Sequence, residues 1–455
     1  MIRKSKYFIL LILAVFIINT GFGCRWSITP KEKIRPITLE YWGVWDTQSQ
    51  LAPLIKSYQD SHPTIKINYR NFRYDEYEKK LIEAWADDRG PDIFSIPVAW
   101  LKNYKHRGRI VPMPSKVSVP IQEISGRDAF IVMKDFPGLS TYDIKDKFVP
   151  VVYDDIVLDG NVYGLPYYID TLVTFYNNNL LINENIAEPI TTWHDLIEQA
   201  PKLTKATLAN DLYQSAVAMG TADNISRYFD IISAILIQYD VPVKGTNFDP
   251  LDSKESTAKM REVLGFYTDF AKPGRASFSW TSDLSNAFEM FANGKLAYFF
   301  GYSYHADELK NRGTQFDLRT TNFPQTKGAQ GTKYFTNYWV NVVAKKSTKQ
   351  DAAWNFIQTT ASQQSVEEYL KANTKPTALR SLVNSQRQDN DLRIFVDQVL
   401  TADNWYDGYD IDLAEQYTAE IIEALVDGTM VLDTDDRTLK LLVNKIRQTY
   451  IKPEW

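Results

Sequence analysis

Strands and helices alternate at the start of the folded part of the chain, and this alternation leaves few folds open to it. The segment "ITLEYW" (37–42) is β-rich, and a helical stretch follows at about 50–59, where apolar residues recur at helical spacing. The segment "TIKINYR" (64–70) then alternates Ile65 and Ile67 with polar residues, as a strand does. A strand, a helix and a strand in this order form the β-α-β unit of a parallel sheet. The sequence therefore predicts an α/β fold.

The same alternation of elements returns after a long stretch that contains proline and serine and shows little periodicity. A two-residue turn at Asp159-Gly160 lies between β-rich flanks and predicts a hairpin. The middle third of the chain is mainly helical. One of its helices is predicted to begin with Ser282 or Asp283 as N-cap and to stop at Gly294. β-rich segments on both sides of a Pro- and Gly-rich turn follow, and the last hundred residues are helical again.

The N-terminus has the three-part layout of an export signal. Arg3, Lys4 and Lys6 form a basic region, and residues 7–18 form an apolar run that is short for a membrane span of about 20 residues. Small residues then lead to Cys24, which is the only cysteine of the chain. A single cysteine cannot form an intramolecular disulfide.

This layout resembles a bacterial lipoprotein signal, whose lipobox ends in a small residue followed by the cysteine that takes the lipid. Gly23 and Cys24 match that pattern, whereas Gly21 stands where leucine is usual. The alternative is an ordinary N-terminal membrane anchor with a bystander cysteine. We predict that residues 1–23 are the signal, that Cys24 is the lipid attachment site, and that residues 24–36 form a polar tether.

The composition is that of a globular protein, and it gives no sign that the partner is a nucleic acid. The chain has 455 residues, a length that suits two or three domains. Of these residues 44% are hydrophobic and 24% are charged, as is typical of a globular protein. Its net charge is −5 and it has no long basic block, so we expect no nucleic acid as a partner. Aromatic residues make up 13% of the chain. A surplus of tryptophan and tyrosine suits a ligand site with flat apolar walls and polar edges.

The chain lacks the common sequence motifs of metal and cofactor chemistry. The four histidines are not paired at metal-ligand spacing, and no metalloprotease, Walker, nucleophile-elbow or dinucleotide motif is present. We therefore predict no metal, no cofactor and no enzymatic activity. Two alternatives stay open. A lipid-anchored surface glycoside hydrolase would need paired acids in a cleft, and an adhesion or scaffold lipoprotein would need no cleft.

Five segments in order carry a resemblance to a known family. They are "GPDIFSIPVAWL", "DGNVYGLPYYIDTLVTFYNNNLL", "TTWHDLIEQAPKL", "NAFEMFANGKLAYFFG" and "YWVNVVAKKSTKQDAAWNFIQ". Together they resemble the extracellular solute-binding proteins that serve carbohydrate ABC importers, the group that includes maltose-binding protein. The turn "YGLP" followed by "TFYNN" is the most specific part, and the resemblance covers residues 37–455.

The resemblance implies a periplasmic-binding-protein-like fold with two α/β lobes. Each lobe would hold a mainly parallel sheet flanked by helices, and three interlobe crossings would join the lobes beside a ligand cleft. The crossings are expected near 169–171, 335–340 and 375–379. Lobe 1 would then comprise 37–168 and 341–374, and lobe 2 would comprise 172–336 and the C-terminal helices at 378–455.

Ligands of open parallel sheets bind at the carboxyl ends of the strands, which are followed here by aromatic and acidic residues. The resemblance places an aromatic after "KLAYFFG" under a sugar and hydroxyl-binding groups at Asp46 and Asp170. We expect Asp170 to accept hydrogen bonds from ligand hydroxyls, because a carboxylate in an aromatic run needs a partner. In the alternative interpretation, the tryptophans only cap hydrophobic clusters. The predicted ligand-binding residues are Trp45, Asp46, Trp100, Tyr168, Asp170, Tyr302, Tyr304 and Trp339.

These observations predict capture of a small solute and its delivery to a membrane permease. The resemblance implies a mono- or oligosaccharide as the ligand and the permease subunits of an ABC importer as partners. We expect export and attachment through the N-terminal lipid to the outer face of the cytoplasmic membrane, or to the outer membrane or periplasm where a cell has them.

Overall fold

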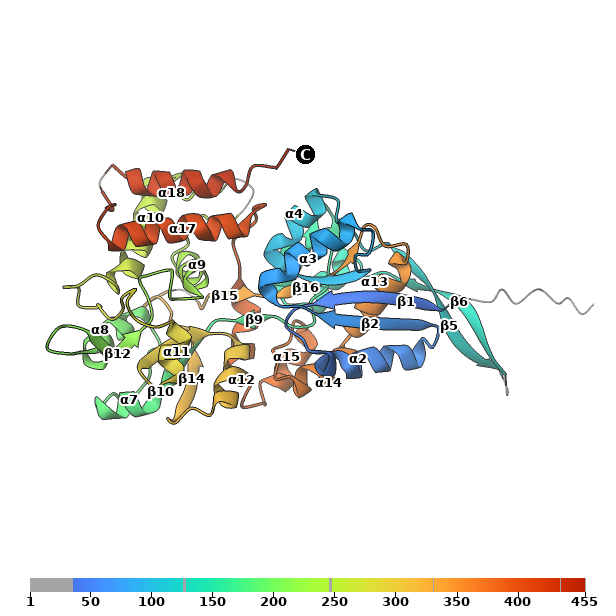
Figure 1. Ribbon diagram of the computed structural model, residues 1–455, viewed down its shortest axis with the longest axis horizontal. Coiled ribbons are helices and arrows are strands. Elements are labelled where there is room, and N and C mark those ends of the chain that lie inside the picture. The colour runs from blue at the N-terminus through green and yellow to red at the C-terminus, as the bar shows by residue number, and fades with distance from the viewer. Residues whose placement is uncertain (1–35, 126–127, 245–247, 330, 434, 455) are drawn as a thin grey trace, which may run out of the picture. The chain divides into compact units, whose positions relative to one another are not determined.

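The computed structural model describes residues 36–125, 128–244, 248–329, 331–433 and 435–454. Two five-stranded sheets, each with its own buried core, organise these residues (Figure 1). The predicted signal, Cys24 and nearly all of the tether fall outside the described residues. No helix in the described part of the chain is both long enough and apolar enough to span a bilayer.

The first sheet begins with the predicted β-α-β unit, which the structure confirms. Strand β1 pairs in parallel with β2 on one side and with β3 on the other. Helix α2 begins at a capping box, in which the side chains of Thr47 and Gln50 each accept a hydrogen bond from the other's backbone N–H. The elements of this unit are β1 (Ile37–Gly43), α2 (Gln48–Ser61), β2 (Ile65–Asn71), α3 (Tyr74–Ala86) and β3 (Ile93–Pro97).

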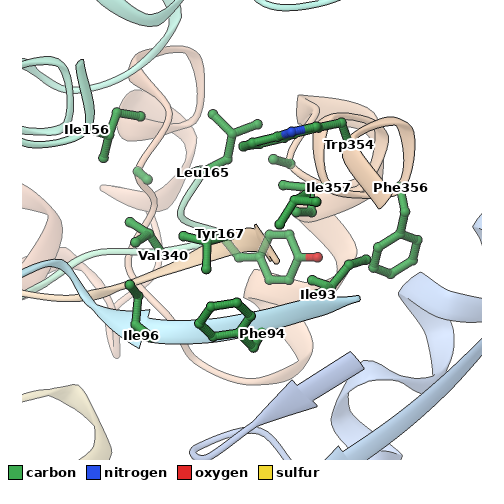
Figure 2. Close-up of a cluster of buried hydrophobic side chains, with 14 of the residues drawn as sticks. Ile93, Phe94, Ile96, Ile156, Leu165, Tyr167, Val340, Trp354, Phe356 and Ile357 are labelled. Carbon is green, nitrogen blue, oxygen red and sulfur yellow. The ribbon is translucent and has the colours of Figure 1, made fainter. Parts of the chain in front are cut away.

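Strands β16 (Trp339–Ala344) and β4 (Ile110–Val111) complete this sheet in the order β2-β1-β3-β16-β4. Helix α13 (Gln350–Thr360) packs against β1 and β16. We call the part of the chain around this sheet lobe 1. Figure 2 shows apolar side chains of β3 and α13 gathered in its core, among them Ile93, Phe94, Ile96, Trp354, Phe356 and Ile357.

The stretch of little periodicity contains a long β-hairpin of β5 (Lys116–Ser125) and β6 (Asp128–Pro137). Pro120 lies inside β5, and a proline inside an apolar run weakens its strand signal, so the hairpin was not predicted. The second hairpin was predicted and is confirmed, with Asp159 and Gly160 at φ 49° and 73° in its turn. The neighbouring elements are η1 (Val98–Trp100), α4 (Leu101–His106), α5 (Thr141–Lys147), α6 (Pro150–Ile156), β7 (Val157–Leu158) and β8 (Asn161–Val162).

The second sheet has the order β11-β12-β13-β10-β14 and forms lobe 2 with the helices around it. Only β12 and β13 are parallel in this sheet, so it is more mixed than the mainly parallel sheet that was expected. Strand β10 contributes to the mixing, because it enters lobe 2 directly from a crossing and lies antiparallel to both of its sheet neighbours, as β16 does in lobe 1. The α/β class and the two-lobe organisation are as predicted.

Lobe 2 is built mainly from the middle of the chain and from its last helices. Its strands are β10 (Val173–Asn177), β11 (Lys205–Ala206), β12 (Leu212–Val217), β13 (Leu296–Gly301) and β14 (Leu318–Asn322). Its helices are α7 (Asn178–Asn183), α8 (Trp193–Leu203), α9 (Tyr228–Gln238), α10 (Lys254–Asp269), α11 (Ala287–Ala292), α12 (Ser303–Arg312), α17 (Ile411–Val426) and α18 (Arg437–Gln448).

One helix start in lobe 2 differs from its prediction. Helix α11 has Asn286 as its N-cap, not Ser282 or Asp283, because the Asn286 side chain accepts the hydrogen bond of the Phe288 backbone N–H. The predicted stop is correct, since Gly294 follows the helix at φ 73°.

A three-stranded sheet, β17-β15-β9, carries the chain between the lobes. It consists of β9 (Asp170–Thr171), β15 (Tyr334–Asn337) and β17 (Ala402–Asp403), and Figure 1 shows β9 and β15 between the two groups of elements. Ile169 belongs to the core of lobe 1 and Leu172 to that of lobe 2. The change of core at β15 occurs between Phe335 and Tyr338.

The third passage between the cores comes later in the chain than the expected crossing at 375–379. Thr377 and Leu379 form bridges with Tyr168 and Phe148 of lobe 1, and this pairing keeps the segment in that lobe. Helix α16 (Arg393–Gln398) lies between the two cores, because Leu392, Val396 and Val399 belong to the core of lobe 1 and Phe395 to that of lobe 2; Ala402 then belongs to the core of lobe 2. The elements of this part are α14 (Gln363–Ala372), α15 (Arg380–Gln386), α16 (Arg393–Gln398) and η2 (Val399–Thr401).

Truncating the core of lobe 1 should destabilise the protein. Phe94 is fully buried on β3, so Phe94→Ala should lower the free energy of unfolding by about 3–5 kcal/mol. Tyr142→Ala is the control, because Tyr142 is 75% exposed on α5 and its removal should change stability by no more than about 0.5 kcal/mol. Urea unfolding followed by circular dichroism measures both, and equal effects would contradict the assigned core.

Candidate functional site

Four aromatic side chains meet at the boundary of the two lobes, and we call them the aromatic cluster: Trp45, Tyr74, Tyr304 and Trp339. The Trp45 ring is stacked against Tyr304, with centroids 5.9 Å apart and an interplanar angle of 17°. On another side it is stacked against Tyr74 at 6.0 Å and 21°. Trp339 meets it edge-on at 5.9 Å and 88°. Tyr304 comes from lobe 2 and the other three from lobe 1, so the cluster joins the lobes.

The sheet of lobe 1 places three of these rings together. Trp45 follows the carboxyl end of β1, and Tyr74 opens α3, just after β2. Trp339 pairs with Pro97, the last residue of β3, because β16 runs antiparallel to β3. All three therefore lie at the carboxyl ends of neighbouring strands, where ligands of such sheets bind. Trp45 is 47% exposed, which leaves part of a flat apolar surface open.

Lobe 2 adds charged groups beside the aromatic cluster, at the starts of α9 and α17. The Asp230 carboxylate accepts a hydrogen bond of 2.8 Å from the Tyr302 hydroxyl and lies 3.4 Å from the Arg227 guanidinium. Arg227 is in turn within electrostatic reach of the Tyr304 hydroxyl. Burial, together with the nearby Asp230 carboxylate, raises the pKa of Glu415 to about 8. These residues were not predicted, because Arg227 and Asp230 are far along the chain from Tyr302 and Glu415 and meet them only in the fold.

A cavity of about 800 Å³ lies next to these charged groups. Its volume is in the range of small-molecule sites. None of the eight residues predicted for the ligand site lines it. Its polar lining comes from both lobes and from β15, and includes Lys102, Asp155, Asp230, Asn337, Asn404 and Glu415. The cavity and the aromatic cluster are linked through Tyr302, which binds Asp230 and stacks on Tyr304 at 6.2 Å.

Asp46 lies half-buried after Trp45, and the protein itself supplies its hydrogen bond. Its carboxylate accepts a hydrogen bond of 2.6 Å from the Tyr369 hydroxyl, and its backbone carbonyl accepts one of 2.6 Å from Tyr69. Burial raises the pKa of Asp46, and the Tyr369 hydroxyl and the Lys375 ammonium oppose that rise. Asp46 therefore holds the loop of Trp45 against lobe 1.

Asp170, on β9, is 5% exposed and also has protein partners. Its carboxylate accepts hydrogen bonds from the Ser303 backbone N–H at 2.9 Å and from the Ser303 hydroxyl at 2.6 Å. The Thr171 N–H donates a third at 3.0 Å. Ser303 is the first residue of α12, where a carboxylate is favoured. Ser303 thus donates the hydrogen bonds that we expected a ligand to donate. A role of Asp170 in ligand binding stays a prediction.

The remaining predicted residues lie at different depths. Trp100 is apart from the cluster: it is 8% exposed and stacks on Tyr104, at 5.7 Å and 9°, in the core of lobe 1. Tyr302 is buried behind Tyr304. Tyr168 is half-buried, with the Lys375 ammonium 5.0 Å from its ring centroid. The structure brings together Trp45, Tyr304 and Trp339, adds Tyr74, which was not predicted, and leaves Trp100 outside.

The stability that Asp170 contributes should depend on pH. Burial raises its pKa from 3.8 to about 7, and the bonds from Ser303 limit that rise. Between these two values the folded protein binds a proton that the unfolded chain releases, so stability falls as pH rises through this window. Asp170→Asn removes this dependence. The difference in melting temperature, wild type minus Asp170→Asn, should therefore decrease between about pH 4 and about pH 8. Parallel pH profiles would contradict the assigned pKa.

Comparison with known protein families shows to which family the chain is related. The family model described as bacterial extracellular solute-binding protein matches residues 53–391. The chain belongs to this family. The resemblance drawn from the five sequence segments is therefore confirmed, and a member of an extracellular family is an exported protein.

Individual relatives of this solute-binding protein are distant. The maltotriose-binding protein of Pyrococcus abyssi is 24% identical over 311 residues, which cover 67% of this chain and 58% of that protein. The mannitol-binding protein of Pseudomonas aeruginosa is 21% identical over 328 residues, covering 69% and 66%. An ABC transporter extracellular-binding protein of Pyrococcus horikoshii is 19% identical over 208 residues, covering 43% of each chain. The matches thus span less than two thirds of the relatives' own lengths.

Solved structures share the fold over nearly the whole chain. The cyclic α-maltosyl-1,6-maltose-binding protein of Arthrobacter globiformis superposes with a TM-score of 0.71, at 15% identity, over 91% of this chain and 99% of that one. The sugar-binding protein MalE of Xanthomonas citri gives 0.67, at 19% identity, over 91% and 97%. These likenesses confirm the two-lobe fold.

Proposed function

We propose that the protein captures a saccharide or a related polyol between its lobes and delivers it to the permease of an ABC importer. The stacking of Trp45 on Tyr304 across the lobe boundary carries this proposal. It places a partly exposed flat ring from lobe 1 against a ring from lobe 2, with carboxylates close by. The maltotriose- and mannitol-binding relatives and the ABC transporter relative support it.

The chemistry of the site suits a ligand that is apolar on its faces and polar around its edge. An aromatic ring covers the C–H face of a sugar, while carboxylates, amides and hydroxyls bind its hydroxyl groups. Ligand contacts from both lobes favour a closed arrangement, by hinge motion at the crossing strands β9 and β15. The family comprises binding proteins, so we propose capture without a chemical reaction.

The location of the protein is a further part of the proposal. The family is extracellular, which supports export by the N-terminal signal. We propose that the lipid on Cys24 then holds the protein at the outer face of the cytoplasmic membrane, or at the outer membrane where one exists. Residues 24–36 would allow the folded part to reach the permease from that anchor.

Removing the ring of Trp45 should weaken saccharide binding. A thermal-shift screen of the mature protein with mono- and oligosaccharides identifies a ligand, because ligand at 100 times its dissociation constant adds about 2.7 kcal/mol of stability. Trp45→Ala should then raise the dissociation constant by about 10- to 150-fold, since losing the contact of a buried aromatic face removes about 1.5–3 kcal/mol. Calorimetric titration measures the change. Tyr213→Ala, at an exposed position of β12, is the control, and equal affinities in both variants would exclude the aromatic cluster as the site.

Substituting the proposed lipid site should change where the protein is found. Cys24→Ala should leave the precursor unprocessed or release the protein from the membrane fraction. Gly21→Leu is the matched variant, because it restores the usual lipobox residue and should be processed at least as fast as wild type. Cell fractionation and mass spectrometry of the N-terminal peptide measure both. A Cys24→Ala variant that behaves like wild type would favour the plain membrane anchor.

A further inference from the structure

The outer half of the β5–β6 hairpin carries apolar side chains that neither core covers. Ile124 is 74% exposed and Met133 is 56% exposed. Phe130, Ile131 and Val132 are half-buried, yet they pack on neither of the two cores that the described residues form. We call these five residues the hairpin patch. A run of apolar residues on an exposed strand is unfavourable in water, and on a folded protein it usually marks a contact surface.

The hairpin patch covers both faces of a two-stranded ribbon. Side chains alternate along a strand, so Ile131 and Met133 lie on one face of β6, and Phe130 and Val132 lie on the other. β5 and β6 form a sheet of their own, so each strand also keeps one edge of unpaired backbone groups. Figure 1 shows the two strands continuing past the start of β1 and out of the body of lobe 1. A protein partner would cover one face of such a ribbon, whereas a lipid surface contacts both.

The base of the hairpin lies beside the start of the folded chain. The Ile37 N–H donates to the Thr64 carbonyl at 2.8 Å, and the Thr64 hydroxyl donates to the Pro120 carbonyl at 3.3 Å. The hairpin patch begins about 14 Å further along β5. Residues 24–36 connect Ile37 to the proposed lipid site, and a flexible chain of that length spans about 20 Å on average. A lipid at the far end of that tether therefore keeps the hairpin patch within reach of the membrane surface.

We propose that the hairpin patch is a membrane-contact site, which lies on the lipid bilayer beside the anchor and orients lobe 1 on it. This inference rests on the lipid anchor proposed above. Apolar side chains from both faces of β6 enter the boundary between the headgroups and the acyl chains. The unpaired backbone groups of the ribbon, and the polar side chains of Gln122 and Glu123 on β5, keep the contact at that depth, because hydrocarbon offers them no hydrogen bonds.

The charges of the hairpin indicate which lipids it contacts. Among its described side chains, Lys116 and Lys134 balance Glu123 and Asp135, and the Lys116 ammonium pairs with the Asp135 carboxylate at 2.8 Å. A ribbon without net charge gains nothing from an anionic surface. The contact therefore depends on apolar area, forms on neutral phosphatidylcholine, and withstands added salt.

The test places a fluorescent label on the hairpin patch of the complete lipid-bearing protein, isolated from membranes and reconstituted in phosphatidylcholine vesicles. Cys24 is the only cysteine, and the proposed lipid blocks its sulfur, so Met133→Cys supplies the single free thiol. Leu208→Cys is the matched control, because Leu208 is a fully exposed apolar residue of lobe 2. Doxyl phosphatidylcholine quenches fluorophores that reach the acyl chains. It should cause a loss of fluorescence at position 133 and none at position 208, and Ile124→Glu should lessen the loss.

The outcomes separate the membrane contact from the anchor. Equal quenching at positions 133 and 208, or quenching at 133 that requires anionic lipid, would overturn the inference. A label at 133 that escapes doxyl lipid while the protein still floats with the vesicles would leave the anchor standing and exclude the contact. If aqueous iodide cannot reach that label either, a protein surface covers the hairpin patch. Labelling of the wild-type protein would show a free Cys24 sulfur, in which case the proposed lipid site fails and the inference fails with it.

Discussion

The contact between Asp170 and Ser303 joins the first crossing to the first turn of α12. The carboxylate accepts the free N–H at the start of the helix and the Ser303 hydroxyl, in a place that water scarcely reaches. An anion at a helix N-terminus is stabilised by the helix dipole and by the unpaired N–H groups there. Tyr304 is the next residue of that helix, and its ring stacks on Trp45 of lobe 1. The contact of Asp170 with Ser303 thus holds β9 beside the helix start that carries the Tyr304 ring.

The two cores explain how such a site is able to open. Each lobe buries its own apolar residues, and the chain passes between them through short strands that share one small sheet. In the proposed function, changes of backbone angle in a few crossing residues would move one lobe against the other without exposing either core. The contacts between the lobes include the aromatic cluster, the hydrogen bonds of Asp170, and polar pairs such as Lys102 with Asp407.

Local patterns in the sequence predicted the β-α-β unit and the Asp159-Gly160 hairpin, and they singled out Trp45, Tyr304 and Trp339, which the structure brings together. Contacts between distant segments could not be predicted in this way. Asp170 and Ser303 are far apart in sequence, and nothing near Asp170 indicates its partner. Trp100 was chosen from its place after β3, and the structure puts it in a 3-10 turn where it stacks on Tyr104 in the core of lobe 1. Arg227 and Glu415 lie on helices whose surface residues give no periodic signal of a site.

The cross-lobe stack of Trp45 on Tyr304 affects how ligands are discriminated. In this arrangement the two rings already shield part of each other from water, so a ligand that takes the place of either ring exchanges one flat apolar contact for another. The apolar area buried on the rings is then nearly the same for ligands of similar size, and the hydrophobic effect contributes little to the difference between such ligands. Stereochemistry becomes decisive: epimers of the same size and hydrophobicity differ only in where their hydroxyls point, and the fixed polar groups around the rings distinguish them.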